Sequence, residues 1–384
     1  MKQFVLLTNI LTPYRRYFYD LLNEEFRKNS IGFHVLLMAE GEPNRPWKYE
    51  DLKTEYTSLL RGHTITLKKY YRYVQVNIGL SEVLDSLHPD FLVCGGSYLS
   101  RTVQNAVSYA HKHKIPVWFW NESTRSEQTN SSLVSAILDR IRRRTLSRYD
   151  GFWTAGKLAA EFVQYYARQT VPMIRVPNLI NPDLYAKALS KAEIAMLKEK
   201  YDLEKDALIL FTPARLSEDK GLQKFLELLE QCSFPHLEWV IAGDGPLRHE
   251  LEEAGEKASF RLKLVGPKKP EEVAELYHAA DLFVLPSLGD PNPLSVIEAS
   301  WAGLPLIVSE HVGNWPELVH EENGIVFDYQ NQAETCQKIS RMLNMSEADL
   351  HQMGQCSRRY AETQYDPKRE VTRIVKELKR EAER

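Results

Sequence analysis

Short apolar segments alternate along the chain with longer segments whose apolar residues recur every three or four positions. This alternation is typical of an α/β protein with parallel sheets. Residues 41–61 have no clear period and predict a loop. The predicted strands of the first half are Phe4–Thr8, Phe33–Met38, Phe91–Cys94, Val117–Trp120 and Gly151–Thr154. The predicted helices there are Tyr14–Arg27, Val76–Leu87, Leu99–His113, Leu133–Leu146 and Lys157–Arg168.

The second half repeats the pattern after a proline-rich break at residues 171–185, which predicts an interdomain linker. Its predicted strands are Ala207–Thr212, Leu237–Ala242, Leu262–Val265, Leu282–Leu285, Leu306–Val308 and Ile325–Phe327. Its predicted helices include Gly221–Gln231, Leu247–Lys257 and Glu271–Ala279, and residues 346–384 form a charged helical tail.

The predicted architecture is therefore two doubly wound, Rossmann-like domains that face each other. We place the first at residues 1–175, the second at 176–365, and a last helix at 366–384 that packs back on the first domain. Such sheets bind ligands beyond the carboxyl ends of their strands, so the expected site is a cleft between the domains.

Composition changes this picture little. The chain has 384 residues, 43% of them hydrophobic and 26% charged, which is ordinary for a globular protein. It lacks an apolar run long enough to span a bilayer. The four cysteines have neither metal-binding nor redox spacing, which indicates reduced thiols in a cytoplasmic protein.

The charge is unevenly distributed. The net charge is −3, yet residues 1–175 carry 24 basic and 16 acidic residues. The basic half suits an anionic acceptor or the inner face of an anionic membrane, and solvated helix faces explain it equally well. The basic segments are Leu67–Gln75 and Arg140–Arg148. We expect no nucleic-acid partner, because the chain is acidic overall and contains no known nucleic-acid-binding module.

The first candidate motif, PARLSEDKG, follows a predicted strand directly. Arg215 and Lys220 thus stand at the carboxyl end of that strand, five residues apart. A guanidinium fork and an ammonium at this spacing suit a diphosphate. A surface lysine ahead of a helix is the alternative explanation for Lys220.

Two further motifs follow strands of the same predicted sheet. In IAGDGP, Gly243 and Gly245 flank Asp244 and permit a close backbone approach. In the segment from Pro286 to Glu310, Asp290 and Glu298 are separated by seven residues. A helix beginning near Pro293 offers backbone amides to a phosphate, and the two carboxylates suit sugar and ribose hydroxyls.

Together these motifs resemble one family, the retaining glycosyltransferases of family 4, which have the GT-B fold. The resemblance implies that Arg215 and Lys220 hold the diphosphate of a nucleotide sugar and act in catalysis with Asp290, which contacts the transferred sugar. It implies that Glu298 contacts the ribose. It also implies donor contacts in the glycine turn and in the loop before the helix, at Gly243, Asp244, Asn292, Pro293, Leu294 and Ser295.

The chain departs from the family pattern at three positions. Asp290 replaces the usual glutamate, Pro293 stands where many members have glycine, and Leu179 replaces the glycine after the linker asparagine. Proline removes one backbone N–H from the loop. These departures leave the identity of the donor open.

The first half offers fewer signals. Tyr14 suits stacking on a sugar, and either Arg15 or Arg16 suits a phosphate, unless the segment simply begins a packed helix. Glu122 follows a strand where many relatives have a histidine near the reacting sugar. Either Glu122 faces the acceptor, or Asn121 or Ser123 caps the next helix.

The resemblance predicts transfer of a sugar from a nucleotide diphosphate donor, with retention of configuration, to a glycan, a lipid-linked glycan or a small molecule. We expect no cofactor and no metal ion, since the two cations neutralise the departing diphosphate. The alternatives are a nucleotide-sugar epimerase, a phosphorylase, or a non-catalytic protein that binds sugar nucleotides.

Overall fold

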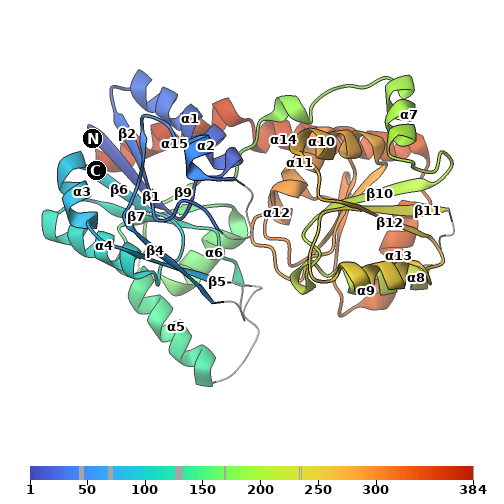
Figure 1. Cartoon of the computed structure of the whole chain (residues 1–384), viewed down its shortest axis with the longest axis horizontal. Coiled ribbons are helices and arrows are strands. Elements are labelled where there is room, and N and C mark those ends of the chain that lie inside the picture. Colours follow the sequence, from blue (N-terminus) through green and yellow to red (C-terminus); the bar gives the residue numbers. More distant parts are fainter. Residues whose placement is uncertain are drawn as a thin grey trace. The chain divides into compact units, whose positions relative to one another are not determined.

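The protein is described here from a computed structural model, which covers residues 1–42, 47–67, 72–125, 133–167, 170–232, 234 and 236–383. The chain forms two compact units (Figure 1). The first comprises Met1–Leu179 and Pro367–Arg384, and the second comprises Ile180–Asp366. Each unit is an α/β structure built on its own parallel sheet.

Among the described residues, seven parallel strands form the sheet of the first unit, in the order β3-β2-β1-β6-β7-β8-β9. They are β1 (Gln3–Thr8), β2 (Gly32–Leu37), β3 (Thr57–Leu59), β6 (Phe91–Cys94), β7 (Val117–Asn121), β8 (Gly151–Thr154) and β9 (Met173–Arg175). The helices are α1 (Pro13–Lys28), α2 (Tyr49–Leu52), α3 (Leu80–Leu87), α4 (Arg101–His113), α5 (Leu133–Leu146), α6 (Lys157–Tyr166) and α15 (Pro367–Ala382).

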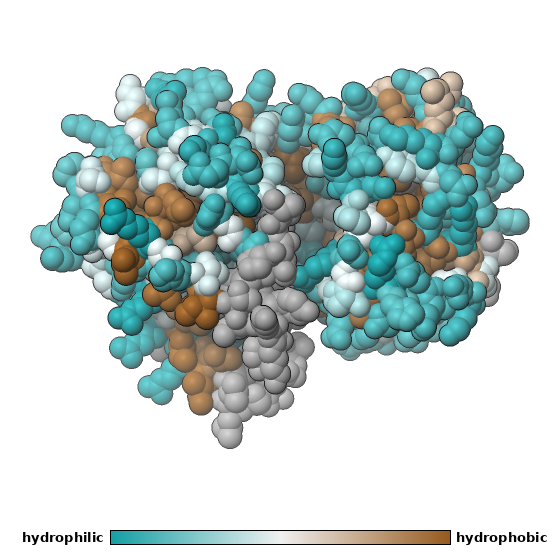
Figure 2. All heavy atoms as spheres, in the orientation of Figure 1, coloured by the Kyte–Doolittle hydropathy of each residue, from teal (hydrophilic) through white to brown (hydrophobic). Residues whose placement is uncertain are grey.

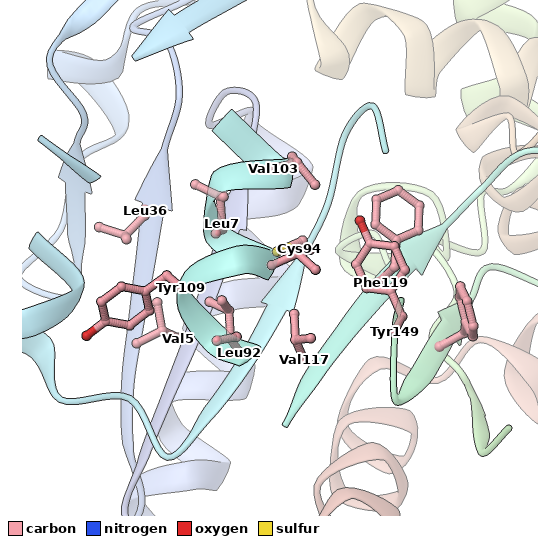
Figure 3. Close-up of a cluster of buried hydrophobic side chains, with 14 of the residues drawn as sticks. Val5, Leu7, Leu36, Leu92, Cys94, Val103, Tyr109, Val117, Phe119 and Tyr149 are labelled. Carbon is pink, nitrogen blue, oxygen red and sulfur yellow. The ribbon is translucent and has the colours of Figure 1, made fainter. Parts of the chain in front are cut away.

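Helices cover both faces of this sheet. Successive strand residues point to opposite faces, so Val5 joins the cluster of side chains beneath α3, α4 and α6 that Figure 3 shows. Its neighbour Phe4 stacks instead on Phe26 of α1, with ring centroids 4.9 Å apart. The strands are buried on both faces, which explains their nearly continuous apolar sequences.

The last helix packs on the first unit. Lys379 donates a hydrogen bond to Asn29 at 2.9 Å, and Arg373 donates one to the carbonyl of Arg175 at 2.6 Å. Arg175 also pairs with Glu370 of α15 at 3.2 Å. The chain therefore returns to its first unit after completing the second.

The second unit contains six parallel strands among its described residues, in the order β12-β11-β10-β13-β14-β15. They are β10 (Leu208–Pro213), β11 (Leu237–Ala242), β12 (Arg261–Gly266), β13 (Leu282–Leu285), β14 (Leu306–Ser309) and β15 (Gly324–Phe327). Its helices are α7 (Lys191–Lys200), α8 (Leu222–Cys232), α9 (Arg248–Gly255), α10 (Pro270–Ala279), α11 (Leu294–Ala302), α12 (Trp315–Leu318), α13 (Gln332–Leu343) and α14 (Glu347–Gln364), with short 3-10 helices η3 (Pro182–Leu184) and η4 (Glu218–Lys220).

The structure corrects the sequence analysis at three places. Residues 173–175, predicted as linker, form the edge strand β9, so the first unit extends to Leu179. The predicted helix Val76–Leu87 begins only at Leu80. Val76 belongs to β5 (Arg72–Asn77), which pairs in antiparallel fashion with β4 (Gly62–Leu67). The predicted loop at 41–61 contains α2 and β3.

Candidate active site

Three loops of the second unit meet at one edge of its sheet. They follow β10, β11 and β13, and β10 lies between the other two strands. Backbone hydrogen bonds join the loops directly: Leu216 donates to the carbonyl of Asp244 at 3.0 Å, and Leu288 donates to that of Asp219 at 2.8 Å. The fold thus brings together the three predicted motifs, as the rule for the carboxyl edge of a parallel sheet requires.

Lys220 and Asp290 form an ion pair across two of these loops. The ammonium of Lys220 lies 2.5 Å from Oδ2 of Asp290, and the side chains are only 18% and 16% exposed. Lys220, predicted to bind the diphosphate, and Asp290, predicted to bind the sugar, are therefore in direct contact, although they lie seventy positions apart in the sequence.

Arg215 belongs to the same cluster of charges. Its Nε donates a hydrogen bond to Ser217 at 3.1 Å, and its Nη2 lies 3.5 Å from Asp219. Lys220 lies 3.8 Å from the other oxygen of Asp219. Asp219 therefore bridges the two predicted cations. Sequence analysis missed this residue, although it lies within the motif and one position before Lys220.

Two glycines allow the loops to approach each other. Gly221 has a φ of 65°, and a Cβ there would lie 2.1 Å from the carbonyl oxygen of Pro286. Gly243 has a φ of 149°, and a Cβ there would lie 1.9 Å from the carbonyl oxygen of Ala214. Both positions favour glycine on backbone and steric grounds. In the same turn as Gly243, the exposed Asp244 carboxylate accepts a hydrogen bond from the amide of Gly245 at 2.9 Å.

The loop after β13 leads into α11, which begins at Leu294. Asn292 and Pro293 are buried, and Leu294 and Ser295 lie half-buried in the first turn. Asn314 donates a hydrogen bond to the carbonyl of Pro293 at 2.8 Å and so fixes the approach of the loop. Helix α11 begins four residues after Asp290, and the partial positive charge of its first amides suits an anion.

Glu298 lies on α11, one turn further along. Oε1 accepts a hydrogen bond from Tyr185 at 3.0 Å, and Oε2 accepts one from Tyr277, also at 3.0 Å. Burial raises the pKa of this carboxyl, and the two hydroxyls oppose the rise. Neither tyrosine was predicted from the sequence, because Tyr185 is the last residue of the predicted linker and Tyr277 lies in α10, far from the motif.

In the first unit, Arg15, Trp120 and Glu122 form a separate cluster. The guanidinium of Arg15 lies 2.8 Å from Glu122 and 3.9 Å from the ring centroid of Trp120. Tyr14 flanks it at 5.3 Å. Burial lowers the pKa of Arg15, but Glu122, Tyr14 and Tyr19 together outweigh this effect and keep the pKa above its ordinary value.

Two of the sequence alternatives concern residues of this cluster. The segment from Tyr14 to Phe18 does begin a packed helix, with Arg15 and Phe18 buried, and a ligand role for Arg15 stays a prediction. Arg16 is directed elsewhere, since it binds Asp20 at 2.7 Å and the carbonyl of Leu52 at 2.6 Å. Asn121 donates hydrogen bonds to the carbonyls of Ser123 and Ala159, at 3.1 and 3.0 Å, and so ties β7 to α6. Arg15 and Glu122 are therefore the polar pair at the carboxyl end of β7.

The described part of the chain contains no group of three or more His, Cys, Asp or Glu side chains arranged to hold a metal ion. Within the same residues, every helix is too short or too polar to cross a membrane. Of the predicted membrane-facing residues, Arg142 is half-buried and contacts Tyr98 at 3.0 Å. Lys68 and Lys69 lie outside the described residues.

Part of the chain is similar in sequence to known glycosyltransferases. Residues 194–360 match the family model for glycosyl transferases group 1. The chain is 31% identical over 161 residues to the UDP-Gal:alpha-D-GlcNAc-diphosphoundecaprenol alpha-1,3-galactosyltransferase of Escherichia coli, covering 40% of each chain. It is 32% identical over 200 residues to the amylovoran biosynthesis glycosyltransferase AmsK of Erwinia amylovora, covering 47% of this chain and 48% of AmsK. The matched segments thus span less than half the length of these relatives.

The whole chain also resembles solved structures. It superposes on Anabaena HepE (Alr3699) in complex with UDP with a TM-score of 0.77, over 99% of this chain and 100% of HepE, at 15% sequence identity. This likeness establishes the fold, two Rossmann-like domains of the GT-B type. Residues 194–360, which match the family model, include Arg215, Lys220, Asp290 and Glu298.

Proposed function

We propose that the protein transfers a sugar from a nucleoside diphosphate sugar to a glycan acceptor, with retention of anomeric configuration. The observation that carries the proposal is the meeting of Arg215, Lys220, Asp290 and the start of α11 at one sheet edge. Two cations and a helix N-terminus suit a diphosphate, and an adjacent carboxylate suits sugar hydroxyls. The relatives named as glycosyltransferases support the same activity.

In this proposal the diphosphate replaces Asp290 as the partner of Lys220. Charge accumulates on the diphosphate as the bond from the sugar C1 to the phosphate oxygen breaks, and Arg215 and Lys220 stabilise that charge. Asp290, released from Lys220, accepts hydrogen bonds from the sugar. The loop amides before Ser295 contribute further positive potential.

Retention follows if the acceptor hydroxyl attacks C1 from the face that the diphosphate leaves. The new bond forms between the acceptor oxygen and C1, and the departing phosphate oxygen takes the hydroxyl proton. In this proposal Asp290 contacts hydroxyl groups of the sugar and not C1, so we assign it no glycosyl-enzyme and infer attack on a single face.

We assign the acceptor to the first unit. The Escherichia coli relative is named for a diphosphoundecaprenol-linked acceptor, and AmsK is named for biosynthesis of the polysaccharide amylovoran. Both names favour a cell-envelope glycan. The Arg15–Glu122 pair, with Tyr14 and Trp120 beside it, combines a charge, a hydrogen-bond acceptor and aromatic faces, which suit a glycan that carries a phosphate.

We further propose that α5 contacts an anionic membrane at the cytoplasmic face. Ile137 and Ile141 are 62% and 41% exposed on this helix, and the exposed Arg140 and Arg144 lie on it as well. Figure 2 shows apolar side chains gathered where Figure 1 places α5. Exposed isoleucines beside arginines are typical of a helix that lies in a lipid interface.

The decisive test is incubation with a panel of nucleotide sugars, beginning with UDP-glucose and UDP-galactose, with and without lipid-linked oligosaccharide. We expect acceptor-dependent release of the nucleoside diphosphate and a glycosidic product of retained configuration by NMR. Interconversion of the sugar nucleotide would indicate an epimerase, and phosphate-dependent cleavage of a glycan would indicate a phosphorylase. Tight binding of a sugar nucleotide without turnover would identify a non-catalytic binding protein.

A further inference from the structure

The Glu298 carboxylate is held by two tyrosines from different parts of the second unit. Tyr185 follows the 3-10 helix η3, and Tyr277 lies in α10. Each donates to a different oxygen of Glu298, and both distances are 3.0 Å. The carboxylate plane is therefore fixed from two directions.

Both rings are themselves held by aromatic packing. Tyr185 lies edge-on to Tyr277, with centroids 5.7 Å apart and planes at 80°. Tyr277 in turn meets Phe211 of β10 at 5.0 Å and 89°. Tyr185 is 6% exposed and Tyr277 is fully buried, so neither side chain can swing away into solvent. These contacts make the tyrosine pair a rigid support for Glu298.

A count of the acceptor positions on Glu298 shows which of them remain for a ligand. An ionised carboxylate offers about four acceptor positions, two on each oxygen. The tyrosines occupy one position on Oε1 and one on Oε2. One position on each oxygen is left for a ligand, which is the pattern needed to accept hydrogen bonds from two adjacent hydroxyl groups.

We propose that Tyr185 and Tyr277 are positioning residues, which orient Glu298 so that it can accept both hydroxyls of the ribose that the family resemblance assigns to it. This inference rests on the proposed function. A 2′-deoxyribonucleotide offers only one of the two hydroxyls, so the preference for a ribonucleotide measures how well the two tyrosines orient the carboxylate.

Tyr277 can form a hydrogen bond with either protonation state of Glu298. Its hydroxyl lies 3.0 Å from the carbonyl of Ser295 as well as 3.0 Å from Glu298. One hydroxyl proton serves one of these acceptors well. When Glu298 is ionised, Tyr277 donates to it. When Glu298 is protonated, it can donate to the Tyr277 oxygen while Tyr277 donates to Ser295. The tyrosine can thus satisfy either form, but only the ionised form accepts two hydroxyls.

The test compares binding of UDP and 2′-deoxy-UDP by calorimetry in the full chain and in Tyr185→Phe, Tyr277→Phe and Glu298→Gln. GDP and 2′-deoxy-GDP serve as a second pair. The control is Tyr201→Phe, which removes a hydroxyl that binds Glu275 elsewhere in the second unit. Thermal unfolding of each variant checks that the domain remains folded.

We expect the wild-type protein and Tyr201→Phe to prefer the ribonucleotide by about tenfold or more, as for a hydrogen bond to a charged group. Each site variant should lose most of this preference while binding the deoxynucleotide nearly as well as wild type does. A preference that survives in both tyrosine variants but disappears in Glu298→Gln would overturn the inference and leave the proposed function intact. Failure of the wild-type protein to bind any nucleoside diphosphate would contradict the proposed function itself.

Discussion

Lys220 is paired with Asp290 at 2.5 Å, so this cation of the site already has an anionic partner. In the proposed mechanism a diphosphate competes with this carboxylate for the ammonium. Asp290 would then oppose binding of a bare nucleoside diphosphate and assist binding of a diphosphate that carries a sugar.

The first prediction follows from this pair. Asp290→Asn should leave UDP binding unchanged or tighter, because the amide no longer neutralises Lys220. It should weaken UDP-sugar binding relative to UDP and reduce transfer by an order of magnitude or more, since a charge-assisted hydrogen bond contributes roughly 1.5–3 kcal/mol. Calorimetry with UDP and the donor sugar nucleotide measures both effects. Equal weakening of both ligands would show that Asp290 does not contact the sugar.

The second prediction concerns the cations. Arg215→Ala should lower transfer and affinity for the nucleoside diphosphate by about tenfold or more, through loss of a charge-assisted contact. The exposed Lys224 lies on α8, which follows the motif, and Lys224→Ala serves as the control. Unaltered nucleotide affinity in Arg215→Ala would remove Arg215 from the diphosphate site.

The role of Lys220 is tested with a double variant, because Lys220→Ala alone would leave the mostly buried Asp290 without its partner. Loss of one member of such a pair costs stability of about 1–3 kcal/mol through the unpaired group. The double variant Lys220→Met with Asp290→Asn avoids this cost. It should unfold near the wild-type temperature and still bind the nucleoside diphosphate weakly. Wild-type affinity in the double variant would exclude Lys220 as a ligand.

The third prediction concerns pH. Burial raises the pKa of Glu298, so this carboxyl becomes protonated at a higher pH than an exposed glutamate does. Because folding raises this pKa, the protonated carboxyl stabilises the folded state. That stability is lost as pH rises through the pKa of the folded protein. The affinity for the ribose depends on pH in the opposite direction and increases as pH rises, because the ionised carboxylate is the form that accepts both hydroxyls. The preference for UDP over 2′-deoxy-UDP should therefore fall as pH is lowered through the pKa of Glu298. A preference independent of pH between 4 and 8 would contradict this assignment.

The strand pattern and the motifs were enough to predict most of the fold. Phe91–Cys94, Leu237–Ala242 and Leu282–Leu285 begin and end where predicted, because each is bounded by polar or turn-forming residues. The edge strand β9 and the hairpin of β4 and β5 were missed. Edge strands are short and half-exposed, so their sequence pattern is weak, and β9 also lies between prolines that indicate a linker.

The sequence indicated contacts between site residues only where those residues lie in the same motif. Arg215 and Lys220 share one motif, and in the structure both contact Asp219, while Lys220 also pairs with Asp290. The contacts of Tyr185 and Tyr277 with Glu298 depend on how η3, α10 and α11 pack. No spacing rule relates those segments, so the support of the carboxylate became visible only in three dimensions.

The fourth prediction is metal independence. Transfer should persist with excess EDTA at the rate seen without it, because Arg215 and Lys220 supply positive charge to the diphosphate. The control is a glycosyltransferase known to need manganese, assayed in the same buffer. Loss of activity with EDTA that magnesium or manganese restores would show that the two cations are insufficient.

The fifth prediction concerns the exposed face of α5. The full chain should sediment with vesicles that contain phosphatidylglycerol and should release at high salt, because basic residues near an anionic surface contribute about 1 kcal/mol each and salt screens them. Arg140→Glu with Arg144→Glu should weaken binding at least tenfold, and Ile137→Ser with Ile141→Ser should weaken it through lost apolar burial. Lys112→Glu changes an exposed charge near the end of α4 and is the matched control. If the two α5 variants sediment as the control does, α5 is not the contact. If the wild-type protein ignores lipid charge and salt, the acceptor must reach the first unit without membrane attachment.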